Sequence, residues 1–263
     1  MNNAIEIDTF NDQKLFSVCT LVTDIEEYSQ MKDSFHLAGF NNENSEFIYI
    51  DNSSFNKYDG YDGLNRFLTV AQGKYIILCH QDIVLKFDTI ETLTARIEEM
   101  NTVDSNWALL GNAGYRDFNR VALRITDPYG DSRNFGPFPA KVVSLDENFI
   151  IAKKSANLAL SNDMKGFHLY GTDLCLIASI LGFSAYVIDF HLYHKSGGTC
   201  GTNFYGVKKE LIQKYQRALS AKYVRTPCTN LFLSNCRLLN YVLNKKIMYS
   251  VKKRFDYLYA KLS

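Results

Sequence analysis

The sequence lacks three features that would each place the protein in a definite class. Its six cysteines form no Cys-x-x-Cys pair and have no regular spacing, which argues against a zinc site and favours a reducing compartment. No run of 18 apolar residues occurs, so no transmembrane helix is predicted. Residues 1–6 carry neither the basic nor the apolar region of a signal peptide. We therefore expect a cytoplasmic protein.

The composition is that of an ordinary globular protein. The chain has 263 residues, of which 46% are hydrophobic, enough for one large domain or for a domain with an appendage. Aromatic residues make up 14%, with 17 Tyr and 18 Phe. Because Tyr is apolar on its ring and polar at its hydroxyl, this content fits carbohydrate or interfacial partners.

The net charge of +1 hides a strong asymmetry along the chain. Residues 206–263 contain 13 Lys or Arg and two acids, a net charge of +11, whereas residues 1–205 have a net charge of −10. We therefore expect a domain over 1–205 and a basic extension over 206–263, which we predict to be helical and without strands. Such a surface fits an anionic partner, and we favour a membrane. A basic face packed on its own domain or on a second copy is the alternative, and nucleic acid is disfavoured because no motif that reads it accompanies the charge.

Strand and helix patterns alternate through the first hundred residues. Apolar, β-branched runs predict strands at 15–22, 46–51 and 74–79, and helical spacing predicts helices at 26–38, 63–72 and 88–103, the last with Asp88 as its N-cap. This order predicts right-handed crossovers and a mainly parallel sheet. Further short strands are expected near 107–110, 121–125, 141–145, 149–152 and 184–189. Residues 111–139 are expected to form a long irregular insertion with one strand, and such insertions are often functional.

An acidic residue ends or follows each of the first three predicted strands. These residues are Asp24, Asp51 and Asp82, and the last belongs to the triplet His80-Gln81-Asp82. Since the carboxyl ends of parallel strands meet at one edge of a sheet, we expect the three carboxylates to converge on a cation or a polar ligand. The alternative for the triplet is a loop that caps the next helix.

A fourth acid, Asp173, opens a predicted helix that ends at Leu181. A carboxylate in the first turn of a helix is stabilised by the helix dipole, and it serves either as a cap or as a base presented to a cleft. His191 and His194 follow the last predicted strand.

Together these motifs resemble the inverting glycosyltransferases of the family 2 type, which have the GT-A fold, over about residues 15–200. The residues that carry the resemblance are Asp51-Asn52-Ser53-Ser54, Gly63-Leu64-Asn65, His80-Gln81-Asp82 in place of Asp-x-Asp, and Thr172-Asp173 in place of Glu-Asp. The resemblance implies an α/β, Rossmann-like sheet flanked by helices, with the helical extension appended.

The resemblance also implies an enzyme, a hexosyltransferase or a related glycosyltransferase. It would move a sugar from a nucleotide-diphosphate donor, a UDP-sugar by preference, to a hydroxyl of a glycan or lipid-linked acceptor with inversion, in bacterial surface polysaccharide synthesis such as that of O-antigen, lipopolysaccharide or capsule. The tail would attach the protein to the inner face of the cell membrane, and a homodimer is compatible with the sequence. Asp173 would be the general base, Asp82 and His194 would bind Mn²⁺ or Mg²⁺, and the donor would contact Thr23, Asp24, Asp51, Asn65, His80 and Gln81.

The sequence departs from this family at two positions. His80 stands where Asp is usual, and Thr172 stands where Glu commonly precedes the base. Because Mg²⁺ prefers oxygen ligands and imidazole suits transition metals, Mn²⁺ is favoured and the need for a metal stays open. A non-catalytic sugar-binding or nucleotide-binding scaffold of the same fold is the main alternative. A nucleotidyltransferase is disfavoured, since residues 22–27 are acidic where a basic phosphate loop would be expected.

Overall fold

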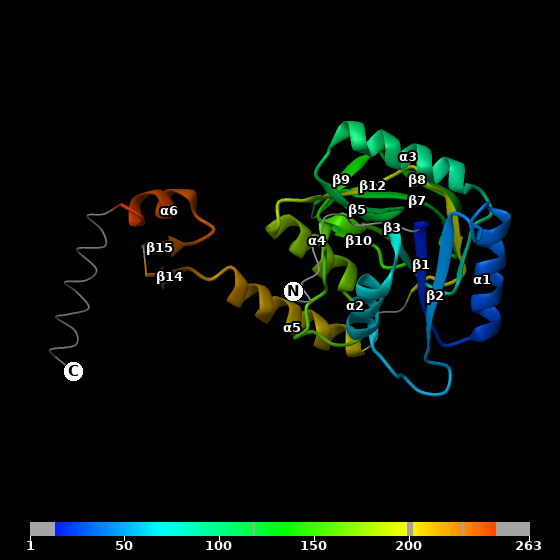
Figure 1. The fold of residues 1–263 in the computed structure, drawn as a ribbon, viewed down its shortest axis with the longest axis horizontal. Coiled ribbons are helices and arrows are strands. Elements are labelled where there is room, and N and C mark those ends of the chain that lie inside the picture. The colour runs from blue at the N-terminus through cyan, green and yellow to red at the C-terminus, as the bar shows by residue number, and fades with distance from the viewer. Residues whose placement is uncertain (1–13, 118, 199–201, 228, 246–263) are drawn as a thin grey trace, which may run out of the picture. The chain divides into compact units, whose positions relative to one another are not determined.

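The computed structural model describes residues 14–117, 119–198, 202–227 and 229–245. The chain divides into two compact units, Met1–Val207 and Lys208–Ser263 (Figure 1). The division proposed from the sequence, after residue 205, lies two residues before the boundary between these units. Each unit is described by itself below.

The first unit begins with the predicted alternation of strands and helices. Its order is β1 (Lys14–Val22), α1 (Ile25–Leu37), β2 (Ser45–Asp51), α2 (Gly60–Val70) and β3 (Gly73–Cys79). Strand β1 lies between β2 and β3 and is parallel to both. The carboxyl ends of these three strands therefore meet at one edge of the sheet, which confirms the predicted arrangement.

The complete first sheet has seven strands and is mixed. Its order is β2-β1-β3-β11-β5-β12-β9, where the added strands are β11 (Phe149–Lys153), β5 (Trp107–Gly111), β12 (Ser184–Val187) and β9 (Ala140–Val142). Strand β11 is antiparallel to both β3 and β5, and β9 is antiparallel to β12. The expected parallel pairing thus holds for the first half of the sheet and for β5 with β12, but not beyond.

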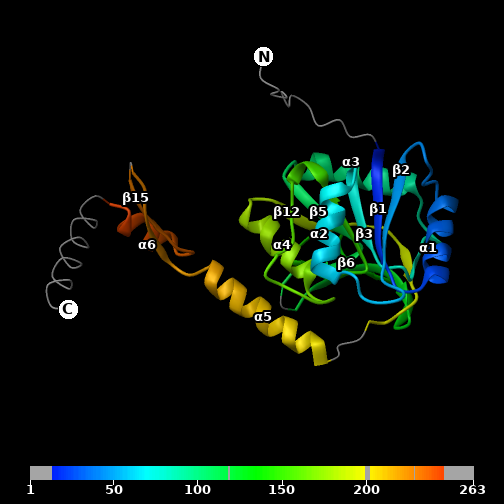
Figure 2. The same ribbon diagram turned by 60° about the horizontal axis from the view of Figure 1, so that its bottom comes forward.

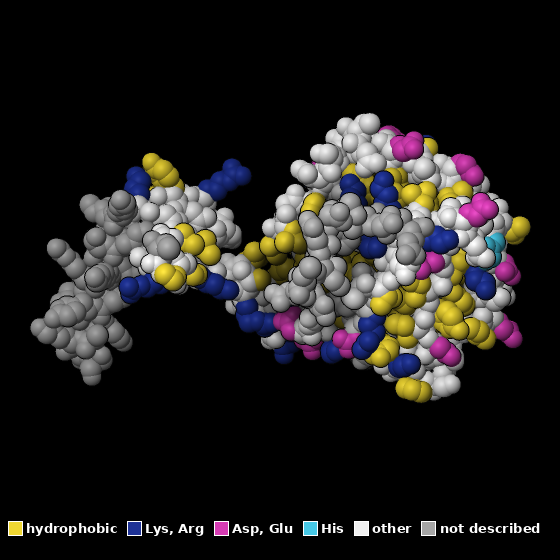
Figure 3. Space-filling view, in the orientation of Figure 1, with side chains coloured by type: hydrophobic (Ala, Val, Ile, Leu, Met, Phe, Trp, Pro, Cys, Tyr) yellow, Lys and Arg dark blue, Asp and Glu magenta, His cyan; other side chains and the backbone are white. Residues whose placement is uncertain are grey.

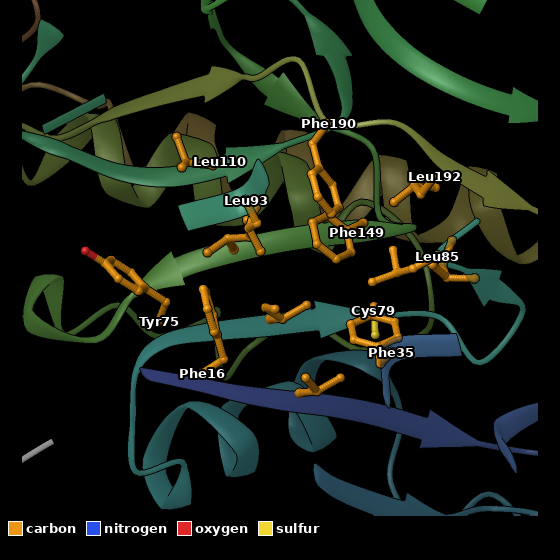
Figure 4. Close-up of a cluster of buried hydrophobic side chains, with 14 of the residues drawn as sticks. Phe16, Phe35, Tyr75, Cys79, Leu85, Leu93, Leu110, Phe149, Phe190 and Leu192 are labelled. Atoms are coloured by element: carbon orange, nitrogen blue, oxygen red, sulfur yellow. The ribbon is translucent and has the colours of Figure 1, made fainter. Parts of the chain in front are cut away.

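Helices cover both faces of this sheet (Figures 1 and 2). Helices α1 and α3 (Ile90–Val103) enclose the main apolar core, in which Phe16, Phe149 and Phe190 are fully buried (Figure 4). Burying a side chain of this size contributes about 1.5–3 kcal/mol. Helix α2 and α4 (Tyr170–Ile180) cover the other face, where a Cβ on Gly63 would meet Leu21.

Helix α3 differs from its prediction at its first residue. Its N-cap is Thr89, and the carboxylate of Asp88 instead accepts a hydrogen bond of 2.5 Å from the backbone N–H of His191. The prediction that Asp88 caps this helix is therefore wrong. An acidic residue just before a helix can cap that helix or accept a hydrogen bond from a distant segment, and the sequence pattern does not distinguish these two roles.

A second sheet joins the strands around residues 111–139. Its order is β10 (Ser144–Leu145), β6 (Ala113–Tyr115), β7 (Val121–Asp127), β13 (Leu192–His194) and β4 (Ile83–Val84), and β8 (Gly130–Phe135) pairs with β7. The expected irregular insertion therefore contains three strands rather than one. The antiparallel pairing of β13 with β4 places His194 opposite Ile83, directly beside Asp82.

The second unit contains strands that the sequence analysis did not predict. Helix α5 (Thr202–Ala218) leads into it, and β14 (Lys222–Arg225) and β15 (Asn230–Leu233) then form an antiparallel hairpin before α6 (Arg237–Leu243). Tyr223 and Phe232 face each other across the hairpin with ring centroids 4.7 Å apart, a pairing that stabilises two strands. The prediction of helices without strands is wrong here. Predicted helical positions beyond Lys245, such as Ile247, lie outside the described residues.

Candidate functional site

A cleft of about 260 Å³ opens at the carboxyl ends of β1 and β3. Its walls combine apolar side chains with several polar ones. The lining residues are Leu21, Thr23, Glu27, Asn52, Leu64, Leu78, Cys79, His80, Gln81, Asp82, Phe167 and Tyr170. An apolar cleft with a few convergent polar groups at this edge of an α/β sheet is the usual form of a small-ligand site.

Three predicted site residues, His80, Asp82 and His194, come together beside this cleft; His80 and Asp82 line it and His194 does not. One nitrogen or carboxylate oxygen from each lies within 4.8 Å of the others. His194 Nε2 is 3.2 Å from Asp82 Oδ2, and His80 Nδ1 is 3.9 Å from Asp82 Oδ1. His80 and Asp82 follow β3, while His194 ends β13, so the pairing of β13 with β4 completes the group.

The charge state of this group suits a cation. Burial opposes ionisation of Asp82, but hydrogen bonds from His194 and Ser196 hold its pKa below the usual range, so it is a carboxylate. Although 41% of the His80 side chain is exposed, desolvation of its ring, opposed by Asp82 and helped by His194, lowers the pKa of His80. A carboxylate beside a neutral imidazole is the protonation state that metal binding requires.

One oxygen of this group has no hydrogen-bond partner. Asp82 Oδ1 is buried and accepts no hydrogen bond from the described residues. A buried acceptor left unsatisfied is costly, and a cation on this oxygen would remove the cost. Two imidazole nitrogens and one carboxylate oxygen fit Mn²⁺ or a similar transition metal better than Mg²⁺, which prefers oxygen.

The Nε2 side of the His80 ring, away from Asp82, is held by a hydrogen bond. Its Nε2 lies 2.8 Å from the hydroxyl of Tyr170, and that hydroxyl donates to the backbone carbonyl of Glu147 at 3.3 Å. The pKa of Tyr170 is raised well above its usual value by burial, then by Glu147 and Asp146, so the hydroxyl keeps its proton.

Two other predicted residues, Thr23 and Gln81, lie at the cleft. The Gln81 amide accepts hydrogen bonds from the backbone N–H groups of Thr23 and Asp24 at 2.7 and 3.0 Å, and it donates to the Thr23 hydroxyl and to Glu27. Gln81, which follows β3, is therefore hydrogen-bonded to the residues that follow β1, and it lines the cleft. A role in contacting a donor stays a prediction for both residues.

Asp24 and Asp51 reach the predicted edge of the sheet but are absent from the cleft lining. Asp24 is the N-cap of α1, where it accepts from the backbone of Glu26 and Glu27. Asp51 is exposed and accepts from the backbone and hydroxyl of Ser53, which lowers the pKa of Asp51. Of the three acids that were expected to converge on one ligand, Asp82 alone lines the cleft. Contacts of Asp24 and Asp51 with a donor remain predictions.

Asn65 and Asp173 both form hydrogen bonds with the loop that contains Leu160 and Ser161. Asn65 Oδ1 accepts from the backbone of Leu160 at 2.7 Å and its Nδ2 donates to the Leu160 carbonyl at 3.0 Å. Asp173 is fully buried and accepts from the backbone and hydroxyl of Ser161 at 2.9 and 2.8 Å. Neither residue lines the cleft. Because a base must reach its substrate, this burial favours a structural role for Asp173 over the role of base implied by the resemblance.

Asp173 is not the cap of α4 either. The N-cap is Leu169, which has a positive φ of 64° and makes no side-chain capping bond. The carboxyl group of Glu147 instead accepts a hydrogen bond from a backbone N–H at the start of α4, that of Gly171, at 3.2 Å. Burial raises the pKa of Glu147 to about 8, opposed by the N–H of Gly171 and helped by the neighbouring Asp146.

The sequence analysis missed the roles of Glu147 and Tyr170. The pair Asp146-Glu147 between two predicted strands was a usable signal, because adjacent acids at a strand end seldom have the same environment. Tyr170 carried no signal of its own, since one Tyr among 17 is not conspicuous.

Comparison with known proteins places the chain in a family. No protein-family model matches it. A protein of Fuscovulum blasticum named "ATP synthase subunits region ORF 6" is 39% identical over 209 residues, which cover 77% of this chain and 84% of that protein. The chain belongs to the same family. The name of this family member states no activity.

Solved structures similar to this chain include glycosyltransferases. The mannosyltransferase PcManGT from Pyrobaculum calidifontis, in complex with GDP-Man and Mn²⁺, matches with a TM-score of 0.51 at 12% identity over 78% of this chain. S. aureus TarS matches with a TM-score of 0.50 at 13% identity over 76%. The chain spans 64% and 39% of these two proteins. At such identities the likeness establishes the GT-A fold alone, and the assignment to family 2 stays a prediction.

Proposed function

We propose that the protein is a glycosyltransferase that uses a nucleotide-diphosphate sugar and a divalent cation. The observation that carries this proposal is the group of His80, Asp82 and His194, with its unpartnered Asp82 oxygen, at the end of β3 beside the cleft. The likeness in fold to PcManGT, which was solved with GDP-Man and Mn²⁺, supports it.

Each part of the cleft has a role in this proposal. His80, Asp82 and His194 hold the cation, which neutralises the charge that develops on the diphosphate leaving group. Thr23 and the Gln81 amide line the donor side, and Phe167 and Leu64 supply apolar surface. Nucleotide identity, with UDP preferred, and inversion at the anomeric carbon belong to the proposal as well.

The general base is proposed to be a carboxylate near the start of α4. The resemblance favours Asp173, but Asp173 is fully buried against Ser161. Asp146 does not line the cleft either, but it is exposed, and its charge is close enough to the cleft residues His80 and Tyr170 to affect the pKa of both. We therefore favour Asp146, which can take a proton from an acceptor hydroxyl without first leaving a buried site.

The activity is tested by nucleotide release with a panel of nucleotide-sugars, with Mn²⁺, with Mg²⁺ and with a chelator. We expect turnover with Mn²⁺ that is lost in Asp82→Asn and retained in Asp117→Asn, a matched change of an exposed carboxylate outside the cleft lining. Asp146→Asn should lose turnover with its fold and donor binding intact. Calorimetric binding of a donor without turnover in any condition would instead favour the scaffold that the sequence left open.

The second unit is proposed to bind an anionic membrane surface, where a lipid-linked acceptor for surface polysaccharide would be presented. Its described residues 208–245 contain eight Lys or Arg and one acid, Glu210. Large apolar side chains of the hairpin and α6 are exposed, including Leu233, Leu238 and Tyr241. Figure 3 shows apolar and basic side chains together on the surface of this unit. Each basic residue near such a surface contributes about 1 kcal/mol. None of the described helices combines the length and apolar character needed to cross a bilayer.

Flotation with liposomes tests this part separately. We expect the full chain to float with anionic liposomes at low salt and less so at high salt, and Leu238→Ser with Tyr241→Ser should weaken the salt-resistant fraction. Equal flotation with neutral liposomes, or none at low salt, would contradict it. Light scattering in the same buffers reports whether the chain is a dimer, the remaining proposal from its sequence.

A further inference from the structure

The imidazole of His80 is held on the side away from Asp82 by a chain of polar contacts. Its Nε2 is 2.8 Å from the hydroxyl of Tyr170, and this hydroxyl is 3.3 Å from the carbonyl oxygen of Glu147. Tyr170 is only 6% exposed, and its ring meets that of Tyr61 edge-on at 6.5 Å. The hydroxyl therefore has little freedom to choose other partners.

The number of available protons determines the direction of the hydrogen bonds between His80, Tyr170 and the Glu147 carbonyl. Tyr170 has one hydroxyl proton, and a neutral imidazole has one N–H. If Nε2 carries the ring proton, it donates to the Tyr170 oxygen, and the hydroxyl donates to the Glu147 carbonyl, so both donors are used. If Nδ1 carries it, the hydroxyl turns to Nε2, the Glu147 carbonyl loses this donor, and the Nδ1 proton faces Asp82 Oδ1 at 3.9 Å, too far for a hydrogen bond.

The first arrangement therefore has one more hydrogen bond than the second. One neutral hydrogen bond shifts a population by roughly two- to tenfold. The preferred tautomer leaves the lone pair of Nδ1 free on the side of Asp82, which is the side where the unpartnered Oδ1 lies.

We infer that Tyr170 is a positioning residue that fixes His80 as its Nε2–H tautomer and so presents Nδ1 to a divalent cation shared with Asp82. The inference rests on the cation site of the proposed function and adds a residue to it. Groups that fix the second nitrogen of a histidine ligand typically change metal affinity by about 10- to 100-fold. Tyr170 begins α4, so the start of that helix sets the ligand geometry at the end of β3.

The test uses the full chain and two matched variants. Tyr170→Phe removes the hydroxyl that touches His80 and keeps the ring. Tyr61→Phe removes a hydroxyl that donates to the His168 carbonyl at 3.1 Å, just before the same helix. Long-range ¹H–¹⁵N correlation spectra of the metal-free proteins report which ring nitrogen carries the proton. The chain has five histidines, and loss of one signal set in His80→Gln assigns His80.

We expect the Nε2–H pattern for His80 in the wild type and in Tyr61→Phe, and a mixture of tautomers in Tyr170→Phe. Titration with Mn²⁺ followed by electron paramagnetic resonance should show about 10-fold weaker binding in Tyr170→Phe and no change in Tyr61→Phe. Trp107 fluorescence, which reports the first unit, checks that both variants are folded.

The possible failures are distinguishable. If the wild type binds Mn²⁺ and Tyr170→Phe binds it equally well, or keeps the wild-type tautomer, the inference is wrong while the cation site stands. If His80 is Nδ1–H in the wild type, the inference is also wrong. If Mn²⁺ does not bind to the wild type at all, both the inference and the cation part of the proposed function are overturned.

Discussion

Glu147 is partly exposed as a residue, but its carboxyl group is desolvated, and we expect this group to make the stability of the first unit depend on pH. It accepts a hydrogen bond from Gly171 at the start of α4, and its surroundings raise its pKa from 4.5 to about 8. At neutral pH the folded protein therefore carries this group protonated, whereas the unfolded chain carries it ionised. The folded state binds the extra proton, so folding becomes less favourable as pH rises.

The size of the effect follows from the two pKa values. Below pH 4.5 both states are protonated and Glu147 costs nothing. Between pH 4.5 and pH 8 the free energy of unfolding falls by about 1.4 kcal/mol per pH unit through this group, and above pH 8 the loss levels off. Between pH 5 and pH 8 the loss is at most about 4 kcal/mol, a large share of the stability of a typical domain. Glu147→Gln keeps the acceptor for Gly171 and removes the ionisation.

Urea unfolding with fluorescence detection measures this effect. The chain has one tryptophan, Trp107, which is fully buried in β5, so its emission reports the first unit. We expect Glu147→Gln to be more stable than the wild type at pH 8, with the difference shrinking toward pH 5. The control is Asp117→Asn, because Arg120 lowers the pKa of Asp117 to about 2 and its ionisation does not change in this range. A wild type and a Glu147→Gln variant with parallel pH profiles would refute the reasoning.

Three further outcomes are expected. Asp173→Asn should lower the free energy of unfolding by roughly 2–3 kcal/mol, since an amide replaces a buried carboxylate that accepts twice from Ser161, and an unchanged urea midpoint with lost turnover would restore Asp173 as the base. Asn65→Ala should destabilise the same loop, seen as faster proteolysis near Leu160, and equal cleavage rates would contradict this. Gly73→Ala should destabilise by about 2 kcal/mol or more in thermal unfolding, because its Cβ would lie 2.5 Å from the Phe16 backbone, and a wild-type melting temperature would be inconsistent with that contact.

The sequence predicted the elements whose pattern is local. The strands and helices of the βαβαβ segment match within a few residues. The position of β11 between β3 and β5 was not predicted, because an apolar run such as Phe149–Ala152 gives no sign of its pairing partner or direction. Strands β6 and β8, within residues 111–139, were missed because they are short and lack the apolar run that predicted β7.

The same distinction applies to the site. His80 and Asp82 share a strand end, so their proximity followed from spacing, and His194 came from the resemblance. Asn65 and Asp173 lie on predicted helices, which the structure has as α2 and α4, but spacing does not say which way a side chain points. Both turn toward the loop at Leu160 and Ser161 rather than into the cleft. Orientation depends on long-range packing, which a local pattern does not contain.

The short pairing of β13 with β4 would tie binding of the proposed cation to the completion of folding. Asp82 and His194 are far apart in the chain and meet only when Tyr193 and His194 pair with Val84 and Ile83. A cation that needs both side chains has no site on an unfolded chain, so it favours the folded state by mass action, by about 2.7 kcal/mol at 100 times its dissociation constant. The metal would then act as a clasp that closes the second sheet, and the melting temperature would rise with its concentration.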